Sequence, residues 1–511
     1  MAYPKLTVVN NYSAAAGGGY DAVILIGDYQ QHIPEDFSSH IERARQFDRR
    51  VGEQALLVTC EVAGGRLITA PTGPLTRDYD DVRQIADAAA AGARIAAEAG
   101  CRKPLLVVFG VPEEEGRYGQ AEAVAYWGFC QALYQPLEAR EALGEDQIET
   151  VTEVGLVGVV NEGWLEAVEA GKRVARDLCG TEPERMAAPR FAEYCQQTFA
   201  QSPVRVTVID DIQQLQHEYP LLMAVARASL GVERHWPCVV RLEYKAPAAE
   251  QTLMMAGKGI VYDTGGVDLK VGGHMAGMSR DKGGAAGVAG FLKTVAEMRP
   301  ETVNVVAELG IVRNSVGADA FVADEIITGH SGVRVRIGNT DAEGRLLLAD
   351  LLSHLRAEAG DYPRPQLFSV ATLTGHAALA KGPYTALIPN GPARVDKITD
   401  RLWEAGEVYG DPTEISWSRR EDFSFVRPRT RSDDVLSSNN GPSATTPRGH
   451  QFPMAFLSIA AGLDKHGTDS EQPLPYVHVD IAGSGVEGGD WQHGKPTATP
   501  VTCFAGCYLH R

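Results

Sequence analysis

Short apolar runs alternate with longer stretches of helical periodicity along the first 170 residues of the chain. Four of these runs have the length and composition of strands buried in a parallel sheet, at residues 22–26, 55–59, 104–109 and 154–159. Two stretches between them predict helices: the alanine-rich residues 82–99, and residues 121–134, which Pro136 ends. Strands that alternate with helices indicate an α/β layer fold.

The same alternation continues beyond a long predicted helix at residues 161–179. We expect buried strands at residues 204–209, 238–244, 252–262, 302–312, 365–374 and 476–481, and helices at 284–298, 342–358 and 452–463. Glycine-rich turns follow these strands, and open α/β sheets bind their ligands at that edge. The polar residues 412–448 predict a long surface loop. The pattern favours an N-terminal α/β domain at residues 1–160, a linker helix at 161–180 and a larger domain at 181–511.

Length and composition agree with an ordinary globular protein of several domains. The chain has 511 residues, of which 44% are hydrophobic and 22% charged. No apolar run approaches the roughly 18 residues that a membrane span requires. The N-terminus lacks a basic region followed by an apolar one, so we expect no secretory signal and a cytoplasmic protein.

The balance of charge argues against nucleic acid as a partner. The net charge is -18, from 48 basic and 66 acidic residues, whereas nucleic-acid binding depends on clustered lysine and arginine. The eight cysteines have no paired zinc-ribbon spacing, so we expect reduced thiols. Cys503, Cys507 and His510 stand close together in the sequence, but no obvious fourth ligand accompanies them, so the evidence for a zinc site there is weak.

Two glycine-rich stretches concentrate charged side chains. Residues 257–286 read GKGIVYDTGGVDLKVGGHMAGMSRDKGGAA, and residues 339–346 read NTDAEGRL. Among their charged residues are Lys258, Asp263, Lys270, Asp281, Asp341, Glu343 and Arg345. Carboxylates this dense repel one another unless a cation lies between them, and hard divalent cations prefer oxygen ligands. Four carboxylates also suffice for two metal ions with shared ligands, an arrangement used by hydrolases.

These stretches closely resemble the signature of the leucyl aminopeptidase family, the two-metal cytosol aminopeptidases. NTDAEGRL matches the family's octapeptide without a break, and the charged positions stand at the family's spacing. Weaker similarity runs from about residue 175 through ATLTG (371–375) to HVDIAG (478–483). GKGIVYDTGG, with NSVG at 314–317, is most similar to an aminopeptidase-like branch found in animals. The resemblance implies two α/β domains: a macro-like N-terminal domain, and a larger catalytic domain whose central mixed sheet is covered by helices.

The resemblance also implies a set of metal ligands. Asp263 and Glu343 would bridge two ions, Asp341 would complete one site, and Asp281 with Lys258 would complete the other. The ions would be Zn²⁺ or Mn²⁺, or else Mg²⁺, and would activate the attacking water. A lysine ligand must lose a proton, which a cation between carboxylates makes feasible. From the local sequence alone, Asp341 could instead cap a helix, with Glu343 in its first turn.

By the same resemblance, two cations act in catalysis. Lys270 would stabilise the oxyanion of the tetrahedral intermediate. Arg345 would hold a bicarbonate ion that relays a proton from water to the leaving amine. A free α-amino group can bind a metal, which selects the N-terminus of a peptide. The pocket for the first side chain would be lined by Met278, Thr372, Gly375 and Ala482.

Two positions depart from the family's pattern. Lys282 follows Asp281 where an apolar residue, often methionine, is usual, and Gly485 stands where some members have methionine. A long flexible cation escapes burial when it can, so we expect Lys282 to turn outward to solvent. If it reached into the first-residue pocket instead, it would disfavour lysine or arginine there and tolerate an acidic residue.

Family members form hexamers with active sites facing an inner cavity, so the resemblance implies a homohexamer acting on peptides with a free N-terminus. Two other functions stay open. The chain could be a catalytically silent relative with a structural or assembly role. Its N-terminal layer could bind a nucleotide or an ADP-ribose-like ligand, for which the triplet Gly17–Gly19 is weak evidence. The sequence has no HExxH motif, which argues against a thermolysin-like zinc site.

Overall fold

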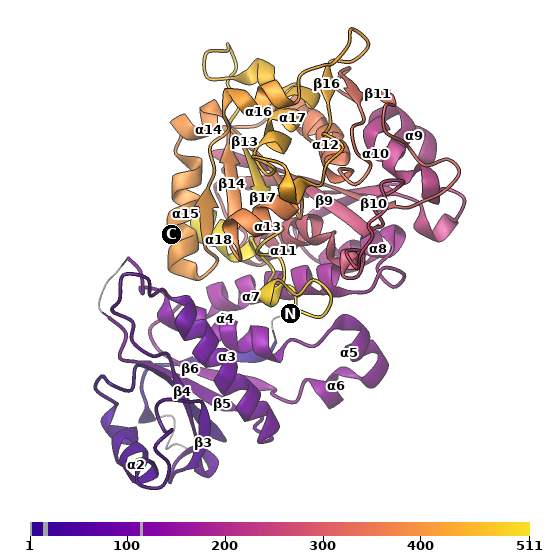
Figure 1. The fold of residues 1–511 in the computed structure, drawn as a ribbon. Coiled ribbons are helices and arrows are strands. Elements are labelled where there is room, and N and C mark those ends of the chain that lie inside the picture. Colours follow the sequence, from indigo (N-terminus) through magenta and orange to yellow (C-terminus); the bar gives the residue numbers. More distant parts are fainter. Residues whose placement is uncertain (1–2, 14–18, 113–115, 511) are drawn as a thin grey trace. The chain divides into compact units, whose positions relative to one another are not determined.

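The computed structural model describes residues 3–13, 19–112 and 116–510. The chain forms two compact units, residues 1–173 with 404–411, and residues 174–403 with 412–511. Each unit is built around a mixed sheet flanked by helices (Figure 1), which confirms the predicted α/β fold class. Gly17 and Gly18 of the glycine triplet lie outside the described residues.

The sheet of the first unit has the strand order β1-β6-β5-β2-β4-β3. Its strands are β1 (Lys5–Val9), β2 (Ala22–Gly27), β3 (Leu56–Thr59), β4 (Arg66–Pro71), β5 (Pro104–Phe109) and β6 (Glu153–Val157). All are parallel except β3, which pairs antiparallel with β4. The prediction of a buried parallel strand at residues 55–59 was therefore wrong. β3 is an edge strand that alternates between half-buried and exposed residues, and its three consecutive apolar residues hid that alternation.

The helices of the first unit are α2 (Glu35–Arg45), α3 (Arg83–Glu98), α4 (Ala121–Leu133), α5 (Leu137–Leu143) and α6 (Glu145–Ile148). The predicted helices at 82–99 and 121–134 are thus present as α3 and α4. These two pack against each other and on the sheet, where small residues such as Ala89 and Gly92 allow a close approach. The long helix predicted at 161–179 is α7 (Glu162–Gly180).

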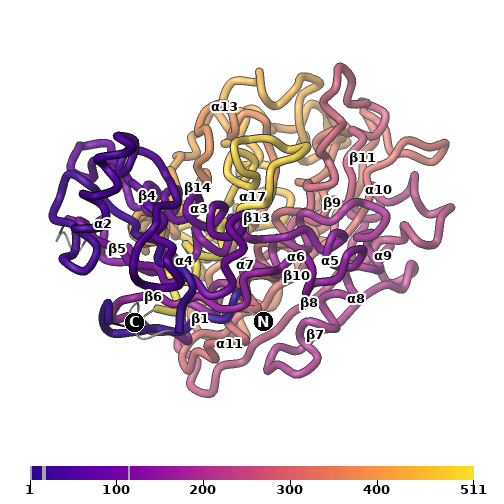
Figure 2. Tube along the Cα trace, turned by 90° about the horizontal axis from the view of Figure 1, so that it is seen from below, coloured from indigo at the N-terminus to yellow at the C-terminus, as the bar shows by residue number. Residues whose placement is uncertain are grey.

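The larger sheet of the second unit has the order β15-β14-β17-β13-β9-β10-β8-β7. Its strands are β7 (Arg205–Ile209), β8 (Cys238–Tyr244), β9 (Gln251–Asp263), β10 (Val303–Asn314), β13 (Pro365–Ala371), β14 (Thr385–Pro389), β15 (Thr413–Ile415) and β17 (Tyr476–Asp480). β7 and β8 lie side by side at one end (Figure 2). Because β7 is an edge strand, it is half-exposed and not buried as predicted.

Helices cover both faces of this sheet. The helices described in the second unit are α8 (Ala188–Phe199), α9 (Ile212–Glu218), α10 (Pro220–Ala226), α11 (Gly283–Met298), α12 (Gly344–Glu358), α13 (Gly375–Lys381), α14 (Gly391–Val395), α16 (Arg420–Phe425), α17 (Phe452–Ala460) and α18 (Val501–Tyr508), and α15 (Ile398–Tyr409) begins in this unit and ends in the first. α11 and α18 pack together on one face, and α12 and α17 pack together on the other (Figure 1). None of the described helices is long and apolar enough to cross a membrane.

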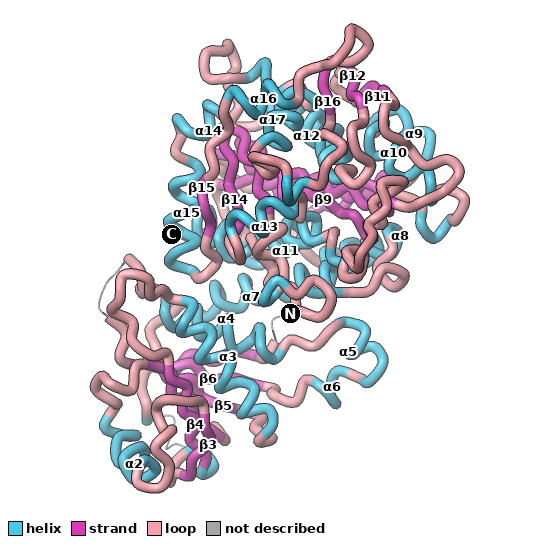
Figure 3. The backbone as a smooth tube through the Cα atoms, viewed as in Figure 1, coloured by secondary structure: helices cyan, strands magenta, loops and turns pink. Residues whose placement is uncertain are grey.

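The segment predicted as a polar surface loop, residues 412–448, is partly ordered and partly buried. It contains β15, α16 and β16 (Val435–Leu436). β16 joins β11 (Ile326–Thr328) and β12 (Arg334–Arg336) in a small separate sheet (Figure 3). The prediction failed because ion pairs satisfy the polar residues inside the fold: Asp433, which is 2% exposed, pairs with Arg336.

Four neighbouring strands of the larger sheet run in the same direction, in the order β17, β13, β9 and β10. Their carboxyl ends therefore meet at one edge of the sheet, where open α/β sheets bind ligands. Asp263 ends β9, Asn314 ends β10 and Asp480 ends β17.

Candidate metal centre

Three carboxylates from the two glycine-rich stretches meet at this edge. One oxygen each of Asp263, Asp341 and Glu343 lies within 4.8 Å of the others. They form the only group of three or more potential metal ligands within that reach among the described residues, so Cys503, Cys507 and His510 do not form one. Glu343 occupies the N-cap of α12, where no side chain caps the described helix start. The alternative in which Asp341 caps this helix is therefore wrong.

Two lysines tie these carboxylates and Asp281 into one cluster. Nζ of Lys258 lies 2.8 Å from Oδ1 of Asp281 and 3.0 Å from Oε1 of Glu343. Nζ of Lys270 lies 2.9 Å from Oδ2 of Asp263 and 2.5 Å from Oδ1 of Asp341. Six of the seven charged residues singled out in the sequence thus share one site.

The cluster carries more negative than positive charge. Four carboxylates face two lysines, and all except Asp341 and Lys270 are deeply buried. Burial raises the pKa of Asp281 and of Glu343, and it raises the pKa of Asp341 to about 7, with neighbouring carboxylates adding to each rise. Burial alone would lower the pKa of Lys258 and of Lys270, but the surrounding carboxylates raise both above the ordinary value. The negative charge of the four carboxylates therefore exceeds the positive charge of the two lysines, and a bound cation could balance the difference.

The donor set fits divalent cations. Oδ2 of Asp281 and Oε2 of Glu343 are buried, and neither has a hydrogen-bond partner in the described part of the chain. An unpaired buried carboxylate oxygen is costly unless a cation or a donor meets it. Carboxylate oxygens are the ligands that hard divalent cations prefer.

A glycine and an asparagine next to the cluster help to position its side chains. A Cβ at Gly344 would lie 2.5 Å from Cε of Lys258, so the glycine of NTDAEGRL leaves the room in which that lysine reaches the carboxylates. Asn314 stands opposite Asp263 in the paired strands β10 and β9, and its Nδ2 donates to Oδ1 of Asp263 at 2.8 Å. Sequence reasoning assigned no role to Asn314, because the register of the two strands is not readable from their residues.

The predicted pocket residues come from three separate segments. Met278 lies in a single 3-10 turn (Met278–Arg280), Thr372 follows β13, Gly375 begins α13, and Ala482 follows β17. Asp480 fixes two of these segments, since its carboxylate accepts from the backbone of Leu373 and Ala482 and from the Thr374 hydroxyl. Thr372 contacts the metal-ligand candidates directly: its hydroxyl donates to Oδ1 of Asp281 at 2.8 Å, and its carbonyl accepts from Nζ of Lys258 at 3.0 Å.

Arg345 lies buried in the first turn of α12. Its Nη1 donates to the carbonyl of Ser437 at 2.8 Å, and its guanidinium carbon stands 4.9 Å from the centre of the Phe452 ring. Burial lowers the pKa of Arg345 to about 10, although nearby Glu343 and Asp480 act in the opposite direction. Its Nε is buried without a hydrogen-bond partner among the described residues. Such a donor suits a small anion.

Lys282 does not turn outward. Its side chain is 0% exposed, and its Nζ donates to the carbonyl of Thr181 at 2.8 Å and to the carbonyl of Ser279. The expectation of a solvent-facing lysine was wrong, because two backbone acceptors within reach compensate for the loss of water.

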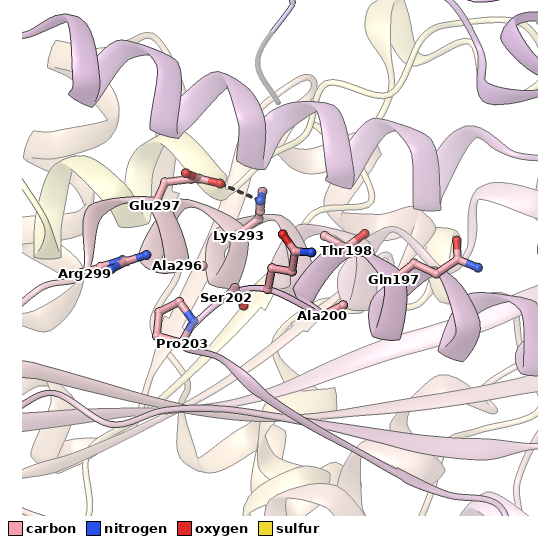
Figure 4. Close-up of a pocket in the computed structure, with 10 residues that line it drawn as sticks. Gln197, Thr198, Ala200, Ser202, Pro203, Lys293, Ala296, Glu297 and Arg299 are labelled. Carbon is pink, nitrogen blue, oxygen red and sulfur yellow. Dashed lines mark ion pairs between the residues drawn. The ribbon is translucent and has the colours of Figure 1, made fainter.

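A surface hollow of about 310 Å³ lies at the ends of α8 and α11 (Figure 4). Its lining includes Gln197, Arg299 and the ion pair of Lys293 with Glu297, whose atoms lie 2.6 Å apart. None of the predicted site residues lines it. The carboxylate cluster is therefore the better candidate for a catalytic site.

Comparison with known proteins agrees with the geometry of this cluster. Residues 173–505 match the catalytic domain of the cytosol aminopeptidase family. The chain belongs to the cytosol aminopeptidase family. It is 43% identical over 456 residues to "Putative aminopeptidase W07G4.4" of Caenorhabditis elegans, covering 88% of this chain and 85% of that protein.

Solved structures share the fold of this cytosol aminopeptidase family member. The apo leucyl aminopeptidase of Trypanosoma cruzi aligns with a TM-score of 0.80 at 20% identity, covering 100% of this chain and 98% of that one. The bottromycin maturation enzyme BotP in complex with Mn aligns with a TM-score of 0.74 at 22% identity, covering 95% and 98%. Family membership makes the chain a peptide hydrolase and supports a metal-dependent aminopeptidase, so the predicted resemblance is confirmed.

Proposed function

We propose that this chain removes the N-terminal residue from peptides with the help of two divalent metal ions held by the carboxylate cluster. The observation that carries the proposal is the excess of buried carboxylates over lysines, with oxygens of Asp281 and Glu343 left unpaired in the described structure. Two cations placed among these oxygens would balance the charge.

The ligands follow from the family's pattern and are compatible with the distances. Asp263 and Glu343 would contact both ions, Asp341 would complete one site, and Asp281 with Lys258 would complete the other. Bound ions would supply Lewis-acid polarisation of the scissile carbonyl and a lowered pKa for the attacking water. Lys258 now donates to Asp281, Glu343 and the Thr372 carbonyl, so it must give up a proton to become a ligand.

Lys270 and Arg345 would act on the substrate. Lys270 is held by Asp263 and Asp341, which keep its ammonium charged and beside two proposed metal ligands. From there it can neutralise the negative oxygen that develops on the attacked carbonyl. Arg345, with its unpaired buried Nε in the described structure, would bind bicarbonate and so hold the group that carries a proton from water to the leaving amine.

Selection of the N-terminus would come from the free α-amino group, which can bind a metal where an amide nitrogen inside a chain cannot. The side chain of the substrate's first residue would enter the space bounded by Met278, Thr372, Gly375 and Ala482. We further propose that the resident ions are Mn²⁺ or Zn²⁺, that the protein is a homohexamer, and that it acts in the cytoplasm. The name of the matched family supports the cytoplasmic location, the Mn-bound structural neighbour supports Mn²⁺, and the family resemblance seen in the sequence motifs is the reason to propose zinc and a hexamer.

A pair of peptides tests the activity. We expect the purified protein, supplied with Mn²⁺, to shorten a leucine-headed peptide one residue at a time, as followed by mass spectrometry. The same peptide with an acetylated N-terminus should stay intact, because its nitrogen can no longer bind a metal. Cleavage of both peptides would contradict an aminopeptidase, and cleavage of neither would favour a catalytically silent relative.

A further inference from the structure

Trp491 lies beside the glycine at position 485, where the chain lacks a side chain. A Cβ at Gly485 would stand 3.5 Å from Cη2 of the Trp491 indole and 3.7 Å from the methyl carbon Cγ2 of Thr372. The edge of the indole and the threonine methyl group therefore both face the space that a residue with a side chain at position 485 would occupy. Trp491 is partly exposed, so its ring is not enclosed by the protein core.

The loop that carries Trp491 is fastened to the turn that carries Met278. Nη1 of Arg280 donates to the carbonyls of Trp491 and Gln492, at 2.9 and 3.1 Å. On the other side of Met278, a Cβ at Gly277 would lie 2.5 Å from the Trp491 carbonyl oxygen, so the two backbones touch there. These contacts hold the backbone of Trp491 against the turn that carries Met278.

The same space adjoins the candidate metal ligands. The hydroxyl of Thr372 donates to Asp281, and its methyl carbon lies 3.7 Å from the point where a Cβ at Gly485 would stand. Thr372 therefore contacts the carboxylate cluster through its hydroxyl, and its methyl group borders the space at Gly485 that Trp491 also borders. A peptide bound through its α-amino group at the cluster would have its first side chain next to Thr372, on the apolar side.

We propose that Trp491 forms an apolar wall of the first-residue pocket and thereby determines specificity, favouring an aliphatic side chain such as that of leucine over glycine. The proposal rests on the aminopeptidase function proposed above. An indole presents a large rigid apolar surface, and contact with it stabilises a bound substrate only if the first side chain of the substrate reaches the ring. Glycine has none, so its hydrolysis is insensitive to this wall.

The test compares kcat/KM for leucine amide and glycine amide in the parent, in Trp491→Ala and in Trp491→Phe. Because one methylene in an apolar pocket changes kcat/KM by about 10- to 200-fold, we expect the leucine-to-glycine ratio to fall about 10-fold or more in Trp491→Ala. Trp491→Phe, which keeps an aromatic ring, should retain most of the ratio. Trp236→Ala is the matched control: this partly exposed tryptophan donates to the Leu230 carbonyl, and its loss should leave the ratio unchanged.

A second variant separates a wall from a merely structural loop residue. In the Trp491→Ala background, Gly485→Met places a flexible apolar side chain in the space that the indole bordered, and it should restore the leucine-to-glycine ratio. An unchanged ratio in Trp491→Ala, or an equal loss of activity toward both amides, would overturn the role of Trp491 and leave the aminopeptidase function standing. If the parent hydrolyses neither amide, the proposed function itself fails, and this inference fails with it.

Discussion

The side-chain hydroxyl of Thr372 donates a hydrogen bond of 2.8 Å to Oδ1 of Asp281. This bond occupies one carboxylate oxygen and leaves Oδ2 of Asp281 without a partner among the described residues, as a ligand for a cation requires. The carbonyl of Thr372 also accepts from Lys258, so one residue orients both groups proposed to complete one metal site. Groups that orient metal ligands in this way contribute strongly to metal affinity.

Thr372→Val tests this orienting role. Valine keeps the shape of threonine and the backbone carbonyl, and it removes only the hydroxyl donor. We expect metal affinity at the site of Asp281 to fall about 10- to 100-fold, measured by titration with Mn²⁺. Thr372→Ser, which keeps the hydroxyl, should bind nearly as tightly as the parent. Equal affinities for valine and serine would show that the bond does not orient Asp281.

Lys270→Ala and Arg345→Ala separate the roles proposed for these two cations. Loss of one donor to a developing oxyanion lowers kcat by about 10²- to 10³-fold, which we expect for Lys270→Ala with the metal content retained. Arg345→Ala should cost less, because water or free bicarbonate can partly replace a relay. Steady-state kinetics on samples of known metal content provide the comparison. Small and equal effects of both changes would mean that the roles are wrongly assigned.

Lys282→Met affects stability and not specificity. The buried Nζ of Lys282 donates to the carbonyls of Thr181 and Ser279, so methionine leaves those acceptors without this donor. An unmade hydrogen bond to a buried group costs about 1–3 kcal/mol, which should appear as a lower free energy of unfolding in urea. The preference between arginine amide and glutamate amide should stay as in the parent. A shift in that preference would mean that the lysine reaches the substrate.

Acid should destabilise the protein partly through His450. Burial lowers the pKa of His450 to about 3, and His450 is hydrogen-bonded to His376 and to Ser416 at 2.7 Å each. In the unfolded chain His450 takes up a proton near pH 6.5, whereas in the folded chain it stays neutral until the pH approaches 3. The free energy of unfolding therefore keeps its full value above pH 6.5, as far as this group is concerned, and decreases as the pH falls toward 3. The slope from one such group is at most about 1.4 kcal/mol per pH unit.

His450→Gln removes this titrating group and keeps an amide that can hydrogen-bond. Chemical unfolding at pH 7, 6 and 5 should therefore show a shallower loss of stability in His450→Gln than in the parent. Parallel pH profiles of parent and variant would contradict the assignment of acid sensitivity to this residue.

The sequence predicted most of the strands of the two large sheets, but not whether each lies in the middle or at an edge. Strands β2, β5, β9, β10, β13 and β17 are covered on both faces and therefore consist largely of apolar residues. Strands β1, β4, β14 and β15 were missed. β1 and β15 are short edge strands, whereas β4 and β14 are buried interior strands whose apolar runs are short. Strand direction was likewise not readable, as β3 shows.

The candidate site was predicted more completely than the fold around it. The two glycine-rich stretches contain the residues that meet in the cluster, and the family resemblance was the reason to expect that stretches this far apart share one site. The supporting contacts were not predictable. Asn314 reaches Asp263 only through strand register, and Lys282 is buried only because the Thr181 carbonyl lies nearby in space. Such long-range partners leave no periodic signal in a single sequence.

Metal content measured in the same sample as leucine-p-nitroanilide hydrolysis tests the two-metal claim most directly. We expect about two divalent ions per chain in the parent, loss of both ions and of activity after chelation, and recovery with Mn²⁺. Asp263→Ala, which removes a carboxylate proposed to contact both ions, should bind neither and hydrolyse nothing. Two ions bound to Asp263→Ala, or hydrolysis by metal-free parent, would contradict the account.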